Sequence, residues 1–131
     1  MATRHQARQA VVSLLYADEL SGINDQFLDE FLEGKKIRNE RRTQVEASLN
    51  GISENLEKID AIINENLKEH KVAELGVIER AILRLGVYEM KFSDTDAPVI
   101  INEAIELAKE LGSESAPKLV NGVLDAIKKA Q

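Results

Sequence analysis

The residues best suited to bind a ligand are cations in two stretches near the N-terminus. Arg4, His5 and Arg8 form the first stretch, and residues 35–42 (KKIRNERR) form the second, with five cations and one anion. Clustered guanidinium and ammonium groups suit phosphate binding, while an ordinary solvated face is an equally good interpretation of charge alone. The whole chain has a net charge of −6, which argues against a general nucleic-acid binder. Residues 53–79 hold seven acids against three lysines, so we expect two differently charged surfaces.

No catalytic or metal-binding constellation stands out in the sequence. A zinc site would need further ligands at helical spacing from His5 or His70, and neither has such a set, while cysteine is absent. Glu103, Glu106 and Glu110 line one side of a predicted helix without the Glu-x-x-His pairs of di-iron bundles, so we expect an exposed acidic face. The sequence also lacks a Walker loop and a nucleophile elbow. We therefore expect no enzymatic activity, no cofactor and no metal.

The composition is typical of a globular protein, with 44% hydrophobic and 31% charged residues in a chain of 131. This length suits one domain, or two small bundles that share a core. No apolar run approaches the roughly 18 residues that span a bilayer, and the N-terminus does not resemble a secretory signal. The absence of cysteine fits a reducing compartment. Together, these features predict a cytoplasmic protein without a membrane partner.

Apolar residues recur every three or four positions along the chain, which predicts an all-α fold. Thr3 and Gln6 have the spacing of a capping box at the start of the first helix. One apolar stripe continues from Asn39 to Glu69 and predicts a single long helix there, while Pro98 suits the first turn of a later helix. The expected helices cover approximately residues 3–20, 25–32, 39–69, 74–91, 97–111 and 117–129.

The first helix has a second apolar face that carries Val12, Tyr16 and Leu20, away from its main buried stripe. One interpretation is that this face packs on the other half of the molecule, and spacing alone slightly favours it. The alternative is an exposed patch, centred on the aromatic ring, for a protein partner.

Residues 77–90 (VIERAILRLGVYEM) have the broad apolar arc of a helix that several neighbours cover. Glu89 projects into this arc, where a carboxylate needs a partner. The next helix begins a few residues later, so we expect Glu89 to accept hydrogen bonds from its free N–H groups. Gly86 and Gly122 lie inside predicted helices, where each costs about 1 kcal/mol relative to Ala. We therefore expect close helix–helix contact at both glycines.

Three motifs in the C-terminal half, taken together and in order, resemble the NusB family of bacterial transcription antitermination factors. They are ERAILRLGVYEM (79–90), VIINEAIELAKELG (99–112) and KLVNGVLDAI (118–127). The resemblance implies two packed three-helix bundles, residues 1–71 and 72–131, that together form one compact domain. It also implies a heterodimer with the ribosomal protein NusE. The two proteins together would bind boxA RNA in nascent ribosomal RNA transcripts. This heterodimer would join the antitermination complex on RNA polymerase.

The resemblance further implies roles for individual residues. The RNA-facing positions of the family correspond here to Arg4, His5, Arg8, Ser115, Lys118 and Leu119. Tyr16 and Glu79 match positions that face NusE, which makes the partner patch the preferred interpretation of Tyr16. Leu119 stands where an aromatic residue is frequent, so a base-stacking contact, typically worth about 1–3 kcal/mol, is lost or replaced. RNA binding by the chain alone is therefore expected to be weak.

The sequence is also compatible with a second class of function. The chain would then be a helical adaptor whose charged faces bind only protein. The two functions differ in salt dependence, because phosphate contacts make RNA affinity fall steeply as salt is added. The basic run at residues 35–42 is not assigned a role by the resemblance.

Overall fold

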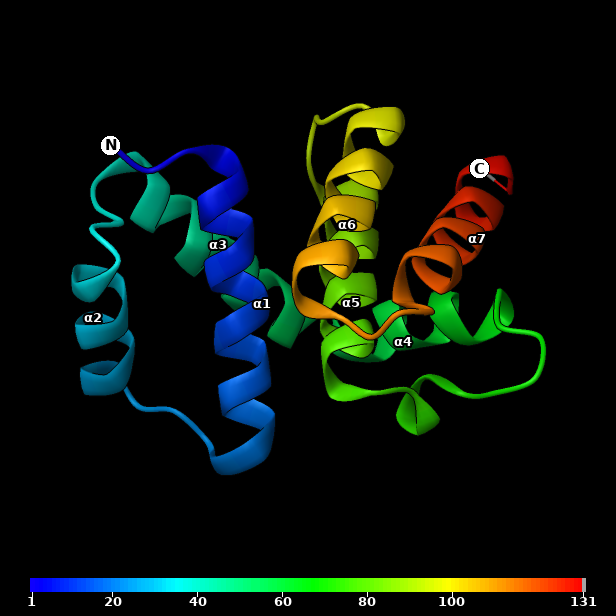
Figure 1. Cartoon of the computed structure of the whole chain (residues 1–131), viewed down its shortest axis with the longest axis horizontal. Coiled ribbons are helices and arrows are strands. Elements are labelled where there is room, and N and C mark those ends of the chain that lie inside the picture. Colours follow the sequence, from blue (N-terminus) through cyan, green and yellow to red (C-terminus); the bar gives the residue numbers. More distant parts are fainter. Residues whose placement is uncertain (131) are drawn as a thin grey trace.

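The computed structural model describes residues 1–130, which are all-α, as the sequence predicts (Figure 1). The elements are α1 (Arg4–Ser21), α2 (Asp25–Gly34), α3 (Glu40–Glu54), α4 (Leu56–Glu65), the 3₁₀ helix η1 (Val72–Glu74), α5 (Val77–Phe92), α6 (Ala97–Leu111) and α7 (Ala116–Lys129). The predicted capping box is present, because the Thr3 hydroxyl accepts from the Gln6 N–H at 3.0 Å and the Gln6 side chain accepts from the Thr3 N–H at 2.8 Å. No helix in the described range combines the length and apolar content needed to cross a membrane.

Helix α5 lies at the centre of the molecule. It packs against α1, α3, α4, α6 and α7, and Figure 1 shows it between the helices of the two ends. This position explains its broad apolar arc, in which Ile82, Leu83 and Val87 are fully buried. Burying such a side chain contributes about 1.5–3 kcal/mol, so α5 is a principal source of stability.

The single helix expected over residues 39–69 is wrong, because the chain turns at Asn55 between α3 and α4. The Asn55 backbone has φ −115° and ψ 18°, outside the helical range. Its side-chain amide donates to the Gly51 carbonyl at 2.8 Å, and its backbone N–H donates to the same carbonyl at 3.1 Å. Asparagine ends helices in this way by competing for backbone groups. The apolar stripe continues across the corner, so periodicity did not reveal the break.

One hydrophobic core runs through both ends of the molecule. Leu14, Ile52, Ile82 and Leu124, from four different helices, all belong to it. Helix α4 contacts α5 and α7 as well as α3, so by packing it joins the C-terminal helices. The division into two bundles between residues 71 and 72 stays a prediction. Such a division would separate α4 from α5 and α7, both of which it contacts.

The helix-interior glycines differ in what surrounds them. Gly86 is buried, and a Cβ added there would lie 3.0 Å from the Leu124 Cδ1, which confirms the expected close contact. Gly122 is exposed, with nothing within 4 Å of an added Cβ, so the expected helix contact there is wrong. Gly51 in α3 faces the ring of Tyr88, with which any added Cβ would collide.

Candidate nucleic-acid and partner interface

Arg8 on α1 is buried in a network of ion pairs. Its Nε donates to both carboxylate oxygens of Glu89 on α5 at 2.9 and 3.2 Å, and its Nη2 donates to one of them at 2.7 Å. Its Nη1 donates to Glu103 on α6 at 2.9 Å. The residue is only 6% exposed, and the hydrogen bonds to Glu89 raise the Arg8 pKa above its usual value. Arg8 therefore fastens α1 to α5 and α6 and does not lie free on the surface.

The expectation that Glu89 caps α6 is wrong. Helix α6 begins after Asp96 without any side-chain cap and with Pro98 in its first turn. Glu89 points instead toward Arg8, because a guanidinium offers full charge and bidentate geometry where a helix start offers only partial charges. The buried carboxylate does need a partner, as the sequence indicates, but the partner comes from α1.

His5 lies between two glutamates of α6. Its Nδ1 is 3.2 Å from a Glu103 oxygen, and its Nε2 is 2.8 Å from a Glu110 oxygen. Burial lowers the pKa of His5, but the hydrogen bonds to Glu110 and Glu103 outweigh burial and leave that pKa raised. Burial likewise raises the pKa of Glu110, while its hydrogen bonds with His5 and Gln9 lower it overall. Glu106 and Glu110 are exposed, as expected for this face, but Glu103 and Glu110 also contact His5 or Arg8 of α1.

The first turn of α1 consequently presents mixed charge. Arg4 is exposed and lines a hollow of about 620 Å³ together with Tyr88, Asp94 and Asp96. His5 and Arg8 already have carboxylate partners. Of the three N-terminal cations predicted to face RNA, Arg4 is the one that the structure leaves most accessible. Within residues 1–130, no group of three or more His, Cys, Asp or Glu side chains is arranged to hold a metal ion.

The other predicted RNA-facing residues lie at the start of α7. Ser115 and Lys118 are exposed, and Leu119 is half-buried. Lys118 and Leu119 line a hollow of about 430 Å³, whose other wall is the chain after α4 and includes His70. Figure 1 shows α6 between α1 and α7, so the six predicted residues form two groups on either side of α6.

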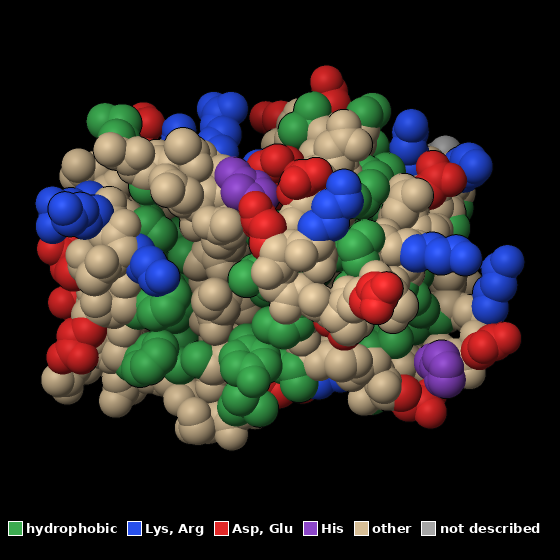
Figure 2. Space-filling model, viewed as in Figure 1, with side chains coloured by type: hydrophobic (Ala, Val, Ile, Leu, Met, Phe, Trp, Pro, Cys, Tyr) green, Lys and Arg blue, Asp and Glu red, His purple; other side chains and the backbone are tan. Residues whose placement is uncertain are grey.

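The predicted partner patch on α1 is exposed in part. Tyr16 is 39% exposed and Leu20 is 58% exposed. Val12 is fully buried, so its inclusion in this patch is wrong. Figure 2 shows hydrophobic side chains gathered over the C-terminal end of α1, at the lower edge of the view.

An ion pair connects this end of α1 to the start of α5. Glu19, one helical turn after Tyr16, pairs with Arg80 on α5. Glu79 precedes Arg80, and its carboxylate lies beside Gly76 and Gly112. The two residues predicted to face a protein partner therefore belong to helix ends that the Glu19–Arg80 pair holds together.

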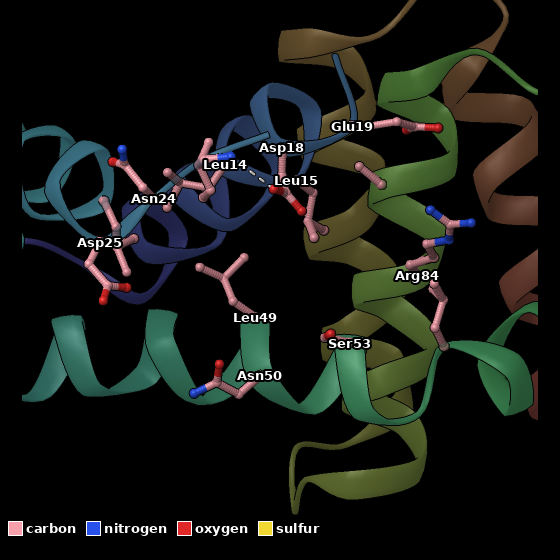
Figure 3. Close-up of a pocket in the computed structure, with 14 residues that line it drawn as sticks. Leu14, Leu15, Asp18, Glu19, Asn24, Asp25, Leu49, Asn50, Ser53 and Arg84 are labelled. Carbon is pink, nitrogen blue, oxygen red and sulfur yellow. Dashed lines mark hydrogen bonds between the residues drawn. The ribbon is translucent and has the colours of Figure 1, made fainter. Parts of the chain in front are cut away.

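A further hollow of about 550 Å³ lies among α1, α2, α3 and α5 (Figure 3). Leu49 of α3 points toward Leu14 and Leu15 of α1 across its apolar part. Its polar groups serve local structure: Asp18 accepts from the Ile23 N–H at 3.0 Å, and Arg84 donates to both oxygens of Asp60 at 2.8 and 2.9 Å. These groups hold a loop and a helix pair, and they do not form a reactive set.

Sequence reasoning missed the role of Glu103 and Glu110 as partners of α1. Their spacing on α6 showed that they share a face, but not what that face meets. His5 and Glu110 are 105 positions apart, so no local pattern could pair them. The only available signal was that a His and an Arg stood on one face of the first helix.

Comparisons with known proteins agree over almost the entire chain. Residues 1–129 match the NusB family. The transcription antitermination protein NusB of Campylobacter concisus (strain 13826) is 59% identical over 128 residues, which is 98% of each chain. The solved structure of T. maritima NusB gives a TM-score of 0.89 at 37% identity, covering 98% of this chain and 92% of that one. A chain in a crystal structure of antitermination factors NusB and NusE with double-stranded RNA gives 0.85 at 34% identity, covering 98% and 97%.

Proposed function

This chain belongs to the NusB family of transcription antitermination proteins, and we propose that it binds boxA-type RNA together with the ribosomal protein NusE. One observation carries the proposal: the likeness, over nearly the full length, to a chain in a solved complex of NusB, NusE and double-stranded RNA. In this role the protein supports ribosomal RNA transcription within the antitermination complex on RNA polymerase. It works in the cytoplasm, by binding and without catalysis.

The RNA surface that we propose has two parts. The start of α1 provides Arg4, with His5 beside it, and the start of α7 provides Ser115, Lys118 and Leu119. The exposure of Arg4 and Lys118 supports phosphate contacts at these positions. The open space beside Gly122 supports close approach of a ligand to the backbone of α7.

Arg8 has a different role in this proposal. Because its guanidinium is buried against Glu89 and Glu103, it acts by holding the start of α1 in position. RNA binding by the free protein should then be weak, since two of the three N-terminal cations already face carboxylates. A second surface, supplied by NusE, gives the complex its affinity.

The surface for NusE is proposed to include Tyr16 and Glu79. An exposed tyrosine combines a large apolar area with a polar tip, which is typical of residues that dominate protein interfaces. Glu79 suits a basic ribosomal protein through charge complementarity.

Replacement of Tyr16 tests the partner surface. We expect Tyr16→Ala to weaken NusE affinity about tenfold or more in calorimetric titration, with little change in melting temperature, because Tyr16 is 39% exposed and lies outside the fully buried core. Phe27→Ala is the matched control, since Phe27 is an exposed aromatic on α2 at 43% exposure. A large loss of stability in Tyr16→Ala, with NusE affinity retained, would show that the ring serves the fold and not the interface.

An RNA titration tests the function itself. The affinity of the protein for a boxA-type RNA and for a scrambled RNA should be measured with and without NusE. We expect the complex to prefer boxA, and its affinity to fall steeply with added salt. Equal affinity for the two RNAs in the presence of NusE would contradict the antitermination role.

The adaptor function remains the second candidate, and the engagement of His5 and Arg8 by glutamates favours it. If the protein is an adaptor, it should bind NusE, while the affinity of the complex for RNA should be low and should depend little on salt. The same titration therefore separates the two functions.

A further inference from the structure

A basic hollow lies where the loop between α2 and α3 meets the start of the chain. Its volume is about 470 Å³, and it is lined by Met1, Ala2, Lys36, Arg38, Asn39, Glu40 and Arg41. Figure 1 shows the N-terminus beside this loop at one end of the long axis, and Figure 2 shows Lys and Arg side chains at the same end. We call this region, defined by Lys36, Arg38 and Arg41, the basic corner.

The loop has a fixed shape that directs its cations outward. Ile37 is 2% exposed and its N–H donates to the Leu32 carbonyl at 2.9 Å, so it anchors the loop in the core. Lys36 and Asn39 have φ angles of 57° and 56°, which non-glycine residues seldom adopt. Lys36 and Arg38 flank the buried Ile37 and are both exposed. The loop therefore adopts an energetically unfavourable backbone conformation in which its positive charges are exposed.

The cations of the basic corner are poorly neutralised. Arg38 pairs with Glu33 at 3.2 Å, but both side chains are more than half exposed, so water and salt weaken the pair. Arg41 donates to the neutral Gln44 at 3.2 Å, and within residues 1–130 neither Arg41 nor Lys36 has an ion-pair partner. Arg8, Arg80 and Arg84, by contrast, are each held by a carboxylate. A positive corner on a chain of net charge −6 suits a polyanion.

We propose that the basic corner is a phosphate-binding extension of the RNA surface, along which the RNA backbone continues from the start of α1. The proposal rests on the proposed function, and continuity supports it: Met1 and Ala2 line the hollow, and Arg4 follows them in the first turn of α1. No aromatic side chain lines the hollow, and its lysine and arginine side chains suit contacts to phosphate. The basic corner therefore contributes affinity for RNA without contributing sequence preference.

The test compares two double variants in complex with NusE. Lys36→Gln with Arg38→Gln removes two charges of the basic corner. Lys128→Gln with Lys129→Gln is the matched control, since both lysines are exposed at the end of α7, at the opposite end of the long axis. The affinity for boxA-type and scrambled RNA is measured over a series of salt concentrations. If the variant of Lys36 and Arg38 has a lowered melting temperature, the double variant Arg38→Gln with Arg41→Gln is used in its place. This second variant leaves Lys36, with its positive φ, unchanged.

We expect the basic-corner variant to bind both RNAs about tenfold more weakly at 0.1 M salt, with the ratio of their affinities unchanged. The slope of log affinity against log salt should become shallower by about 1.4, as for two lost contacts to single-stranded RNA. Affinity and slope equal to those of the control would overturn the proposal, and so would weakened NusE binding with unchanged RNA binding. A loss restricted to boxA would also overturn it. Failure of the wild-type complex to prefer boxA would instead contradict the proposed function.

Discussion

Arg8 and Glu89 join two helices that are distant in the sequence, and their burial makes each dependent on the other. Their side chains are 7% and 11% exposed, and the closest oxygen–nitrogen distance is 2.7 Å. Removing one member of a buried pair leaves an uncompensated charge, which typically costs about 3–5 kcal/mol. Glu103 is a second acceptor for Arg8, so the network has some redundancy.

Substitution of Glu89 tests this account. We expect Glu89→Leu to lower the free energy of unfolding by about 3–5 kcal/mol, because Arg8 would lose its main partner. Glu89→Gln should cost less, since its amide oxygen still accepts a hydrogen bond and Glu103 still supplies charge. Chemical denaturation measures both. Glu106→Gln is the control, because Glu106 is exposed and should change stability by less than about 0.5 kcal/mol. Equal unfolding free energies for wild type and Glu89→Leu would rule out the buried pair as a stabilising contact.

His5 gives the molecule a pH dependence whose sign follows from its raised pKa. Protonation is favoured in the folded state, so the stabilisation is complete below the unfolded pKa of about 6.5. It is then lost as pH rises through the higher pKa of the folded state. We expect the stability advantage of wild type over His5→Gln to shrink between pH 6 and pH 8.5, as measured by denaturation at each pH. An advantage that grows with pH would contradict the contacts of His5 with Glu103 and Glu110.

At the scale of elements, the helices and most of their limits follow from periodicity and capping. The apolar spacing predicts the helical class, and Thr3 and Gln6 predict the start of α1. The corner at Asn55 was missed because the same residues face the core on both sides of it. The contact between Gly51 and Tyr88 was missed for another reason: its members lie on different helices, and only the packed structure brings them together.

Replacement of two helix-interior glycines by alanine should change the free energy of unfolding in opposite directions. At Gly122 a Cβ meets nothing, so we expect Gly122→Ala to raise the free energy of unfolding by about 1 kcal/mol through helix propensity. At Gly51 the Cβ would collide with the Tyr88 ring, so we expect Gly51→Ala to lower stability by about 1–3 kcal/mol. Thermal or chemical unfolding of the two variants under the same conditions makes the comparison. Changes of the same sign would contradict the packing at one of the two positions.

In the molecule as a whole, the sequence predicted the exposure of these side chains more reliably than it predicted their contact partners. Tyr16, Arg4 and Lys118 are accessible, as a binding role requires. Arg8 is buried against Glu89 of α5 and Glu103 of α6, which lie 81 and 95 positions away in the sequence. His5 contacts Glu103 and Glu110 of α6, which lie 98 and 105 positions away. Pairing over such a distance depends on the tertiary arrangement of three helices, which no local pattern contains.

We propose that cations on either side of α6, at the starts of α1 and α7, act together on one RNA. The most direct measurement is the salt dependence of boxA affinity, in complex with NusE, for the double variant Arg4→Gln with Lys118→Gln. We expect a loss of affinity of about tenfold at 0.1 M salt, and a slope of log affinity against log salt that is shallower by about 1.4 than that of wild type. Affinity and slope indistinguishable from wild type, with NusE binding intact, would contradict it.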